Sequence, residues 1–166
     1  MRQNHLQSIF GVIIVVIILS CTLVTIAIFV HLGDPDEELK RPHDYDVDGV
    51  TSGGFILGGS GYSEYISESA GYSYKFTMNY IVLDGPSKGD KGEKSFTIIC
   101  DSKDGPSSSL YTLIREEKVD DTDCKVWSYV SSQYVLEFAM DQKLIVHSFT
   151  IVIDEMKFTG NLDDGS

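Results

Sequence analysis

The hydrophobic positions of this chain follow one pattern near the N-terminus and another in the rest. Residues 9–30 are almost uniformly apolar and contain no charged residue and no proline. An α-helix rises ~1.5 Å per residue, so a helix of this length crosses the ~30 Å hydrocarbon layer of a bilayer. The pattern therefore predicts one N-terminal transmembrane helix.

The charges on the two sides of this apolar segment differ. Arg2 precedes it, whereas Asp34 and Asp36 follow it closely. The positive-inside rule places the N-terminus in the cytosol and predicts a single-pass type II protein of the cell membrane with its C-terminal domain outside. The alternative is a signal peptide that is cleaved after Ala27, in which case the domain is secreted. Both interpretations export the C-terminal part.

Beyond the apolar segment, polar and apolar residues alternate with a period of two, which is typical of half-buried strands. The clearest example is Tyr72–Leu83, where the aromatic residues fall on one face. The segments with this character, each rich in β-branched or aromatic residues, are Gly54–Leu57, Tyr72–Leu83, Ser95–Cys100, Leu110–Arg115, Lys125–Val130, Gln133–Ala139 and Leu144–Ile153.

Turn-forming residues separate these segments, and no segment after residue 31 has a sustained helical period. The chain is therefore predicted to hold an all-β ectodomain, an antiparallel sandwich or jelly roll of about seven strands. Residues 140–143 are predicted to join Tyr134–Ala139 and Leu144–Ile151 in a hairpin.

These patterns predict five consecutive parts of the chain. They are a short cytoplasmic N-terminus (1–8), a transmembrane signal-anchor helix (9–30), an acidic extended spacer (31–49), an extracellular β-rich domain (50–160) and a disordered tail (161–166).

The net charge restricts the class of partner. The chain carries 25 acidic and 13 basic residues, a formal charge of −12, and every acidic residue lies from Asp34 onward. Such a surface repels nucleic acid and attracts cations or basic proteins. The predicted partners are the membrane, through residues 9–30, and an extracellular protein or a cation.

Two of the three cysteines lie in the predicted β-rich part. Because Cys21 falls inside the apolar segment, Cys100 and Cys124 are the pair available to form a disulfide in an oxidising compartment. In the chain-entropy model such a bridge stabilises the fold by roughly 3 kcal/mol. The alternative is two free buried thiols.

One acidic cluster has the composition of a calcium loop. Asp44, Asp46 and Asp48 alternate ahead of Gly49, the arrangement that places carboxylate oxygens on one side of a tight turn. The match to an EF-hand ends at its twelfth position, where Phe55 replaces the required glutamate. The cluster therefore predicts calcium, the one candidate cofactor, in a loop without flanking helices. A solvated spacer is the alternative.

No catalytic motif is present in the sequence. His147, the one histidine of the strand region, sits among Ile145, Val146 and Phe149, where a satisfied or surface histidine is expected instead of a catalytic base. The sequence therefore predicts a non-enzymatic, membrane-anchored binding or adhesion module. The alternative is an acidic, calcium-binding protein of the extracellular matrix or of mineral.

Overall fold

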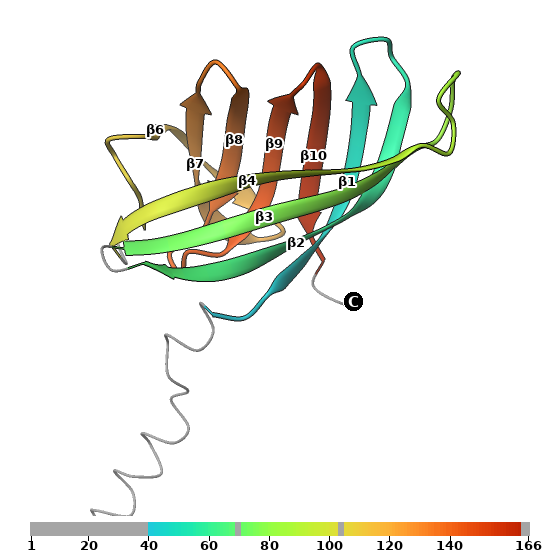
Figure 1. Cartoon of the computed structure of the whole chain (residues 1–166). Helices are drawn as coiled ribbons and strands as arrows, with labels where there is room; N and C mark the ends of the chain where they lie inside the picture. Colours follow the sequence, from blue (N-terminus) through green and yellow to red (C-terminus); the bar gives the residue numbers. More distant parts are fainter. Residues whose placement is uncertain (1–39, 69–70, 103–104, 164–166) are drawn as a thin grey trace, which may run out of the picture. The chain divides into compact units, whose positions relative to one another are not determined.

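The computed structural model describes residues 40–68, 71–102 and 105–163 (Figure 1). They form ten strands. These are β1 (His43–Thr51), β2 (Ile56–Glu68), β3 (Gly71–Val82), β4 (Lys91–Ser102), β5 (Gly105–Pro106), β6 (Thr112–Val119), β7 (Thr122–Val130), β8 (Tyr134–Met140), β9 (Val146–Ile153) and β10 (Met156–Leu162). The predicted all-β antiparallel class is confirmed.

The topology is not that of the predicted jelly-roll alternative. The described strands form one sheet in the order β5-β4-β3-β2-β1-β10-β9-β8-β7-β6. Strands that are consecutive in sequence pair with each other, with the exception of β5 and β6. In addition, β1 pairs with β10. Hairpin turns link most of these strands, so the sheet is a meander without the crossovers of a jelly roll.

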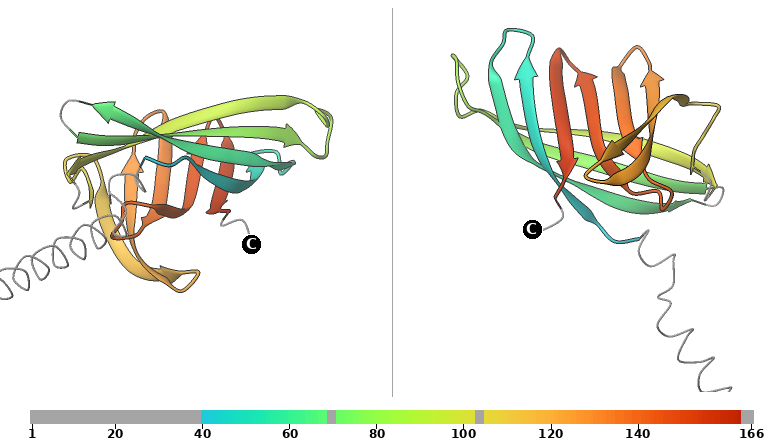
Figure 2. Two further views of the ribbon diagram at one scale, coloured as in Figure 1. Left: turned by 90° about the horizontal axis from the view of Figure 1, so that it is seen from below. Right: turned by 180° about the vertical axis from the view of Figure 1, so that it is seen from behind.

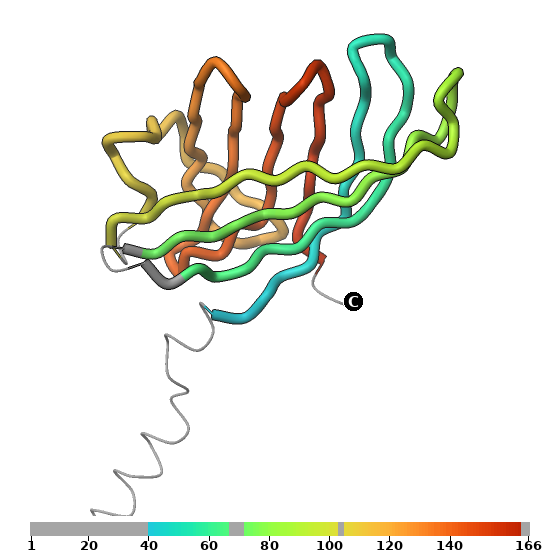
Figure 3. Tube along the Cα trace, viewed as in Figure 1, coloured from blue at the N-terminus to red at the C-terminus, as the bar shows by residue number. Residues whose placement is uncertain are grey.

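The sheet curls so that two of its parts face each other. Strands β2, β3 and β4 cross over the face made by β1 and β7–β10, and the view from below shows the same two layers (Figures 1 and 2). The chain runs from β5 directly to β6, so the two edges of the sheet are consecutive in sequence (Figure 3). A curled sheet of this kind encloses a core on its inner face.

Aromatic rings fill the centre of that core. Phe76 stacks on Phe96 with ring centroids 4.8 Å apart, and Phe149 meets both rings edge-on at 5.8 and 5.1 Å. Tyr45 lies against Phe149 at 5.6 Å and donates a hydrogen bond to the carbonyl of Val146 at 2.9 Å. Each aromatic pair adds roughly 0.5–1.5 kcal/mol beyond the burial of its area.

Glycines on neighbouring strands make room for two of these large rings. Gly160 pairs directly with Phe149, and a Cβ built on the glycine would lie 2.3 Å from that ring. Gly92 pairs with Tyr80 in the same way, with the Tyr80 ring 2.4 Å from its built Cβ. An aromatic ring that covers a cross-strand glycine holds a tightly curved sheet in register.

The structure corrects the predicted limits of the β-rich domain. Strand β1 begins at His43, inside the predicted spacer 31–49, and β10 continues to Leu162, inside the predicted tail 161–166. The two misassigned segments pair with each other, Tyr45 opposite Leu162. Their pairing joins the first half of the sheet to the second.

The predicted membrane anchor, residues 9–30, lies outside the described residues. Within residues 40–68, 71–102 and 105–163, no helix has the length and apolarity needed to cross a membrane.

Candidate binding cleft

The sheet does not close, and a cleft lies between its two edges. Its walls come from β5 on one side and from β6 and β7 on the other, and the turn between β8 and β9 completes the lining. The cleft has a volume of about 870 Å³, within the usual range of ligand pockets. We call it the seam cleft.

Both edge strands of the sheet contribute residues to the seam cleft. Strands β5 and β6 stand at the ends of the strand order, so within the described part of the chain each has only one strand neighbour. Lys118 of β6 and Gly105 of β5 both line the cleft. The outer backbone N–H and C=O groups of an edge strand are available to another strand.

Apolar side chains form the inner part of the seam cleft. Trp127, the only tryptophan of the chain, is half-buried and lines it together with Pro106, Met140 and Leu144. Met140 and Leu144 are 2% and 4% exposed. Trp127 projects from the inner face of β7, because it pairs with Phe138 and packs against the main core. The sequence predicted core packing for Trp127, and the cleft adds an accessible face.

Charged side chains surround this apolar part. The lining contains four acidic residues, Glu116, Glu117, Asp123 and Asp141, and two basic residues, Lys118 and Lys125. Lys118 lies 3.7 Å from the Asp123 carboxylate. The excess of carboxylates gives the cleft a negative rim, which favours partners with basic side chains.

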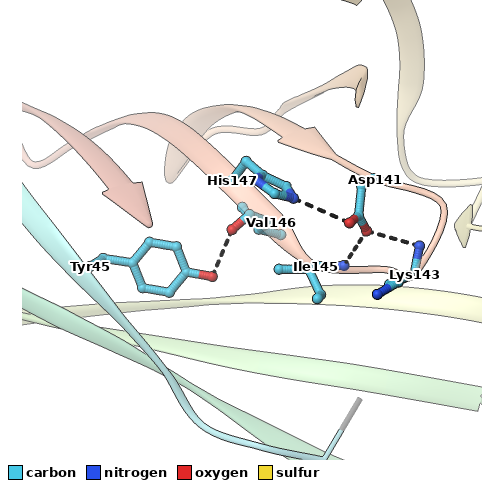
Figure 4. Close-up of polar contacts among 6 residues, drawn as sticks. All are labelled: Tyr45, Asp141, Lys143, Ile145, Val146 and His147. Carbon is cyan, nitrogen blue, oxygen red and sulfur yellow. Dashed lines mark hydrogen bonds and ion pairs between the residues drawn. The ribbon is translucent and has the colours of Figure 1, made fainter. Parts of the chain in front are cut away.

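The β8–β9 turn that borders the cleft is held by one carboxylate (Figure 4). Oδ1 of Asp141 accepts hydrogen bonds from the backbone N–H groups of Lys143 and Ile145, each at 2.9 Å. Oδ2 of Asp141 lies 3.2 Å from Nε2 of His147. Leu144 between them has φ of 63°, a left-handed conformation that costs a leucine about 1 kcal/mol. Asp141 therefore fixes a strained turn at the cleft.

His147 is a satisfied histidine, one of the two outcomes that the sequence predicted, and its partner is Asp141. The side chains of His147 and Asp141 are 14% and 10% exposed, so the pair is largely shielded from solvent. The predicted β8–β9 hairpin is confirmed as well, with Phe138 opposite Phe149.

The predicted disulfide is not present in the structure. Cys100 and Cys124 are both free and buried. Cys100 faces the main core from β4, whereas Cys124 belongs to a separate small cluster with Val126 and Ala139. Even-numbered residues of β7 face away from the main core that Trp127 contacts, because successive side chains of a strand point to opposite faces. The two thiols therefore lie on different faces of the sheet.

Burial makes both thiols poor nucleophiles at neutral pH. It raises the pKa of Cys100 to about 12, and the charge of Asp101 adds to the effect. Burial also raises the pKa of Cys124 to about 11, with a further contribution from Asp141. Reactive cysteines need a lowered pKa and access to solvent.

The predicted calcium loop is a strand. Asp44, Asp46 and Asp48 lie in β1, where they are exposed and alternate with the buried Tyr45 and Val47. Alternate side chains of a strand stand about 6.6 Å apart along one face, so the three carboxylates do not converge as a calcium turn requires. Among the described residues, no group of three or more His, Cys, Asp or Glu side chains is placed to hold a metal ion.

A second hollow lies at the β1–β2 and β3–β4 turns. It has a volume of about 610 Å³ and is lined by residues that include Phe55, Tyr80 and Met156. It is smaller than the seam cleft and does not lie between the two edges of the sheet.

Sequence reasoning missed the β6 wall of the cleft. The strand was predicted as Leu110–Arg115, whereas β6 spans Thr112–Val119 and most of its residues are exposed. A charged run from Arg115 to Lys118 without apolar alternation is typical of an edge strand, and this was the available signal.

The chain matches no family model and no curated protein. Among solved structures, it is similar to the crystal structure of a beta-barrel-like protein of domain of unknown function DUF1849 from Brucella abortus. The identity is 10% and the TM-score 0.47, over 74% of this chain and 95% of that chain.

Proposed function

We propose that this chain is a non-enzymatic binding or adhesion module that holds its partner in the seam cleft. The observation that carries the proposal is a hollow at the place where the sheet stays open, with a half-buried Trp127 in its lining. Aromatic side chains in partly desolvated pockets contribute a large share of binding energy at protein interfaces.

The expected cellular location of the module comes from the sequence. An anchor at residues 9–30 would display the domain outside the cell, where an extracellular protein is the natural partner. Cleavage after Ala27 would release the same module in secreted form. The calcium-binding alternative loses its main support, because the acidic residues of β1 lie along a strand.

A binding screen with matched variants tests the proposal. The full-length chain in a non-ionic detergent is passed over an immobilised library of random dodecapeptides, and the peptides that retain it are identified. Binding of the Trp127→Ala and Ile56→Ala variants to these peptides is then measured. Ile56 is 54% exposed and does not line the seam cleft, which makes it the control.

The proposal predicts that Trp127→Ala loses retained peptides and that Ile56→Ala keeps them, while circular dichroism shows both variants folded. Equal retention by both variants would contradict it, as would a library without retained peptides.

A further inference from the structure

We infer that the partner of the seam cleft binds as an extended strand whose main chain pairs with the free edge of β6. This inference rests on the proposed function and specifies the kind of partner. The free edge of β6 is a row of backbone donors and acceptors, and the group that satisfies such a row is another β-strand.

The neighbouring strands leave the β6 edge open to the incoming strand. At the other edge of the sheet, β5 consists only of Gly105 and Pro106. The loop after β5 covers part of β4 through side-chain contacts, since the Tyr111 hydroxyl accepts a hydrogen bond from the N–H of Ile99 at 3.1 Å. Strand β6 therefore offers the longer free edge at the seam.

The side chains of β6 specify the chemistry of the incoming strand. Leu113 and Ile114, at the start of β6, are 44% and 45% exposed. The charged run Arg115–Lys118 follows. Cross-strand neighbours prefer apolar next to apolar and opposite charges next to each other. The fitting partner is a segment with an apolar part beside Leu113 and Ile114, and with basic side chains beside Glu116 and Glu117.

The same features disfavour a second copy of this chain. Two copies would bring together molecules that each carry a formal charge of −12. Like charges on an edge strand protect it against pairing with its own copies. The partner is therefore a basic, amphipathic segment of another protein.

The inward-facing side chains of the bound strand would enter the hollow beside Trp127. Because Trp127 is the only tryptophan, intrinsic fluorescence reports occupancy of the cleft. Hydrogen exchange at the amides of β6 reports main-chain pairing separately. The two readouts distinguish filling of the cleft from addition of a strand.

The probe is a twelve-residue peptide that alternates valine and lysine, titrated into the full-length chain in a non-ionic detergent. Its first control carries N-methyl groups on the valines, and its second carries N-methyl groups on the lysines. In an extended strand the N–H groups of alternate residues point to opposite edges, so only one control loses the hydrogen bonds to β6. A third control replaces every lysine with glutamate.

We expect the probe to change Trp127 fluorescence and to slow exchange at alternate amides of Thr112–Val119. One N-methylated peptide is expected to lose at least about tenfold in affinity and the other to keep most of it, since several main-chain hydrogen bonds disappear in only one of them. The glutamate peptide is expected to bind far more weakly.

A fluorescence change without protection of β6, or equal binding by both N-methylated peptides, would overturn strand addition and leave the cleft-binding proposal standing. No fluorescence change with the probe would overturn the strand inference, and the proposed function would fail as well if the peptide library also gave no retained peptide. Protection of β6 that rises with protein concentration in the absence of peptide would instead show pairing between copies.

Discussion

The β8–β9 and β6–β7 hairpins are neighbours in one sheet but are packed differently. In β8 the residues from Phe138 to Met140 are all buried, and its turn is held by Asp141. In β6 most residues are exposed, and its turn consists of Asp120 and Asp121, both at positive φ. The first hairpin joins the core, whereas the second forms a wall of the seam cleft. The part of the sheet that provides most of the stability therefore differs from the part that lines the proposed binding site.

The largest expected effect comes from the core side of this comparison. Phe149→Ala removes a ring that contacts Phe76 and Phe96 and should lower the free energy of unfolding by about 3–5 kcal/mol. The matched change on β6, Leu113→Ala, should cost less than about 1 kcal/mol because Leu113 is 44% exposed. Urea unfolding followed by circular dichroism gives both values. Similar losses of unfolding free energy in the two variants would contradict the difference in packing between the two hairpins.

A smaller difference is expected between the two turns. Asp141→Ala leaves the N–H groups of Lys143 and Ile145 without their acceptor and should cost about 2–3 kcal/mol. Asp121→Gly should change stability by less than about 0.5 kcal/mol, because glycine tolerates the φ of 63° at that position. Thermal unfolding of the two variants checks this. A neutral Asp141→Ala variant would show that the carboxylate does not fix the turn.

Alkaline pH should weaken the core through the buried thiol of Cys100. Burial raises the pKa of Cys100 to about 12, whereas an unfolded cysteine has a pKa of about 8.5. The unfolded chain then loses this proton first, so the stabilisation is complete below pH ~8.5 and disappears as pH rises toward 12. Urea midpoints should fall between pH 8 and pH 10, and less so in Cys100→Ala. Identical pH slopes in the two proteins would contradict this cause.

The smallest effect is expected for the ion pairs of β6. Arg115 donates to Glu117 at 2.8 Å and to Glu137 at 2.7 Å, and all three side chains are substantially exposed. Exposed pairs of this kind contribute about 0–1 kcal/mol, so Arg115→Ala should hardly change the urea midpoint in 0.5 M salt. A loss comparable to that of Asp141→Ala would mean that β6 is part of the core.

Local patterns predicted the elements whose inner and outer faces differ clearly. Tyr72–Leu83 was predicted as a strand and corresponds to β3, and the hairpin around residues 140–143 was predicted with its partner strands. In β1 the same alternation was present, but the carboxylates of Asp44, Asp46 and Asp48 led to a calcium loop instead. A strand with acidic residues at its outer positions and a calcium-binding turn can have the same local sequence pattern.

Local sequence patterns could not predict the position of the seam cleft. Its position depends on the pairing of β1 with β10, which brings Tyr45 opposite Leu162 across nearly the whole domain. That pairing leaves β5 and β6 as the two edges of the sheet. The register also explains why Trp127 borders a cleft, although its own strand predicts only core packing. Contacts between distant segments decided both features.

Native-state hydrogen exchange of the free, full-length chain tests the open seam most directly. We predict the slowest amides in β9, whose strand neighbours are β8 and β10, and fast exchange at every second amide of β6, whose only strand neighbour among the described residues is β7. Protection of every β6 amide to the level of β9 at all protein concentrations would show that the sheet closes on itself. It would contradict the assignment of this seam as the binding site.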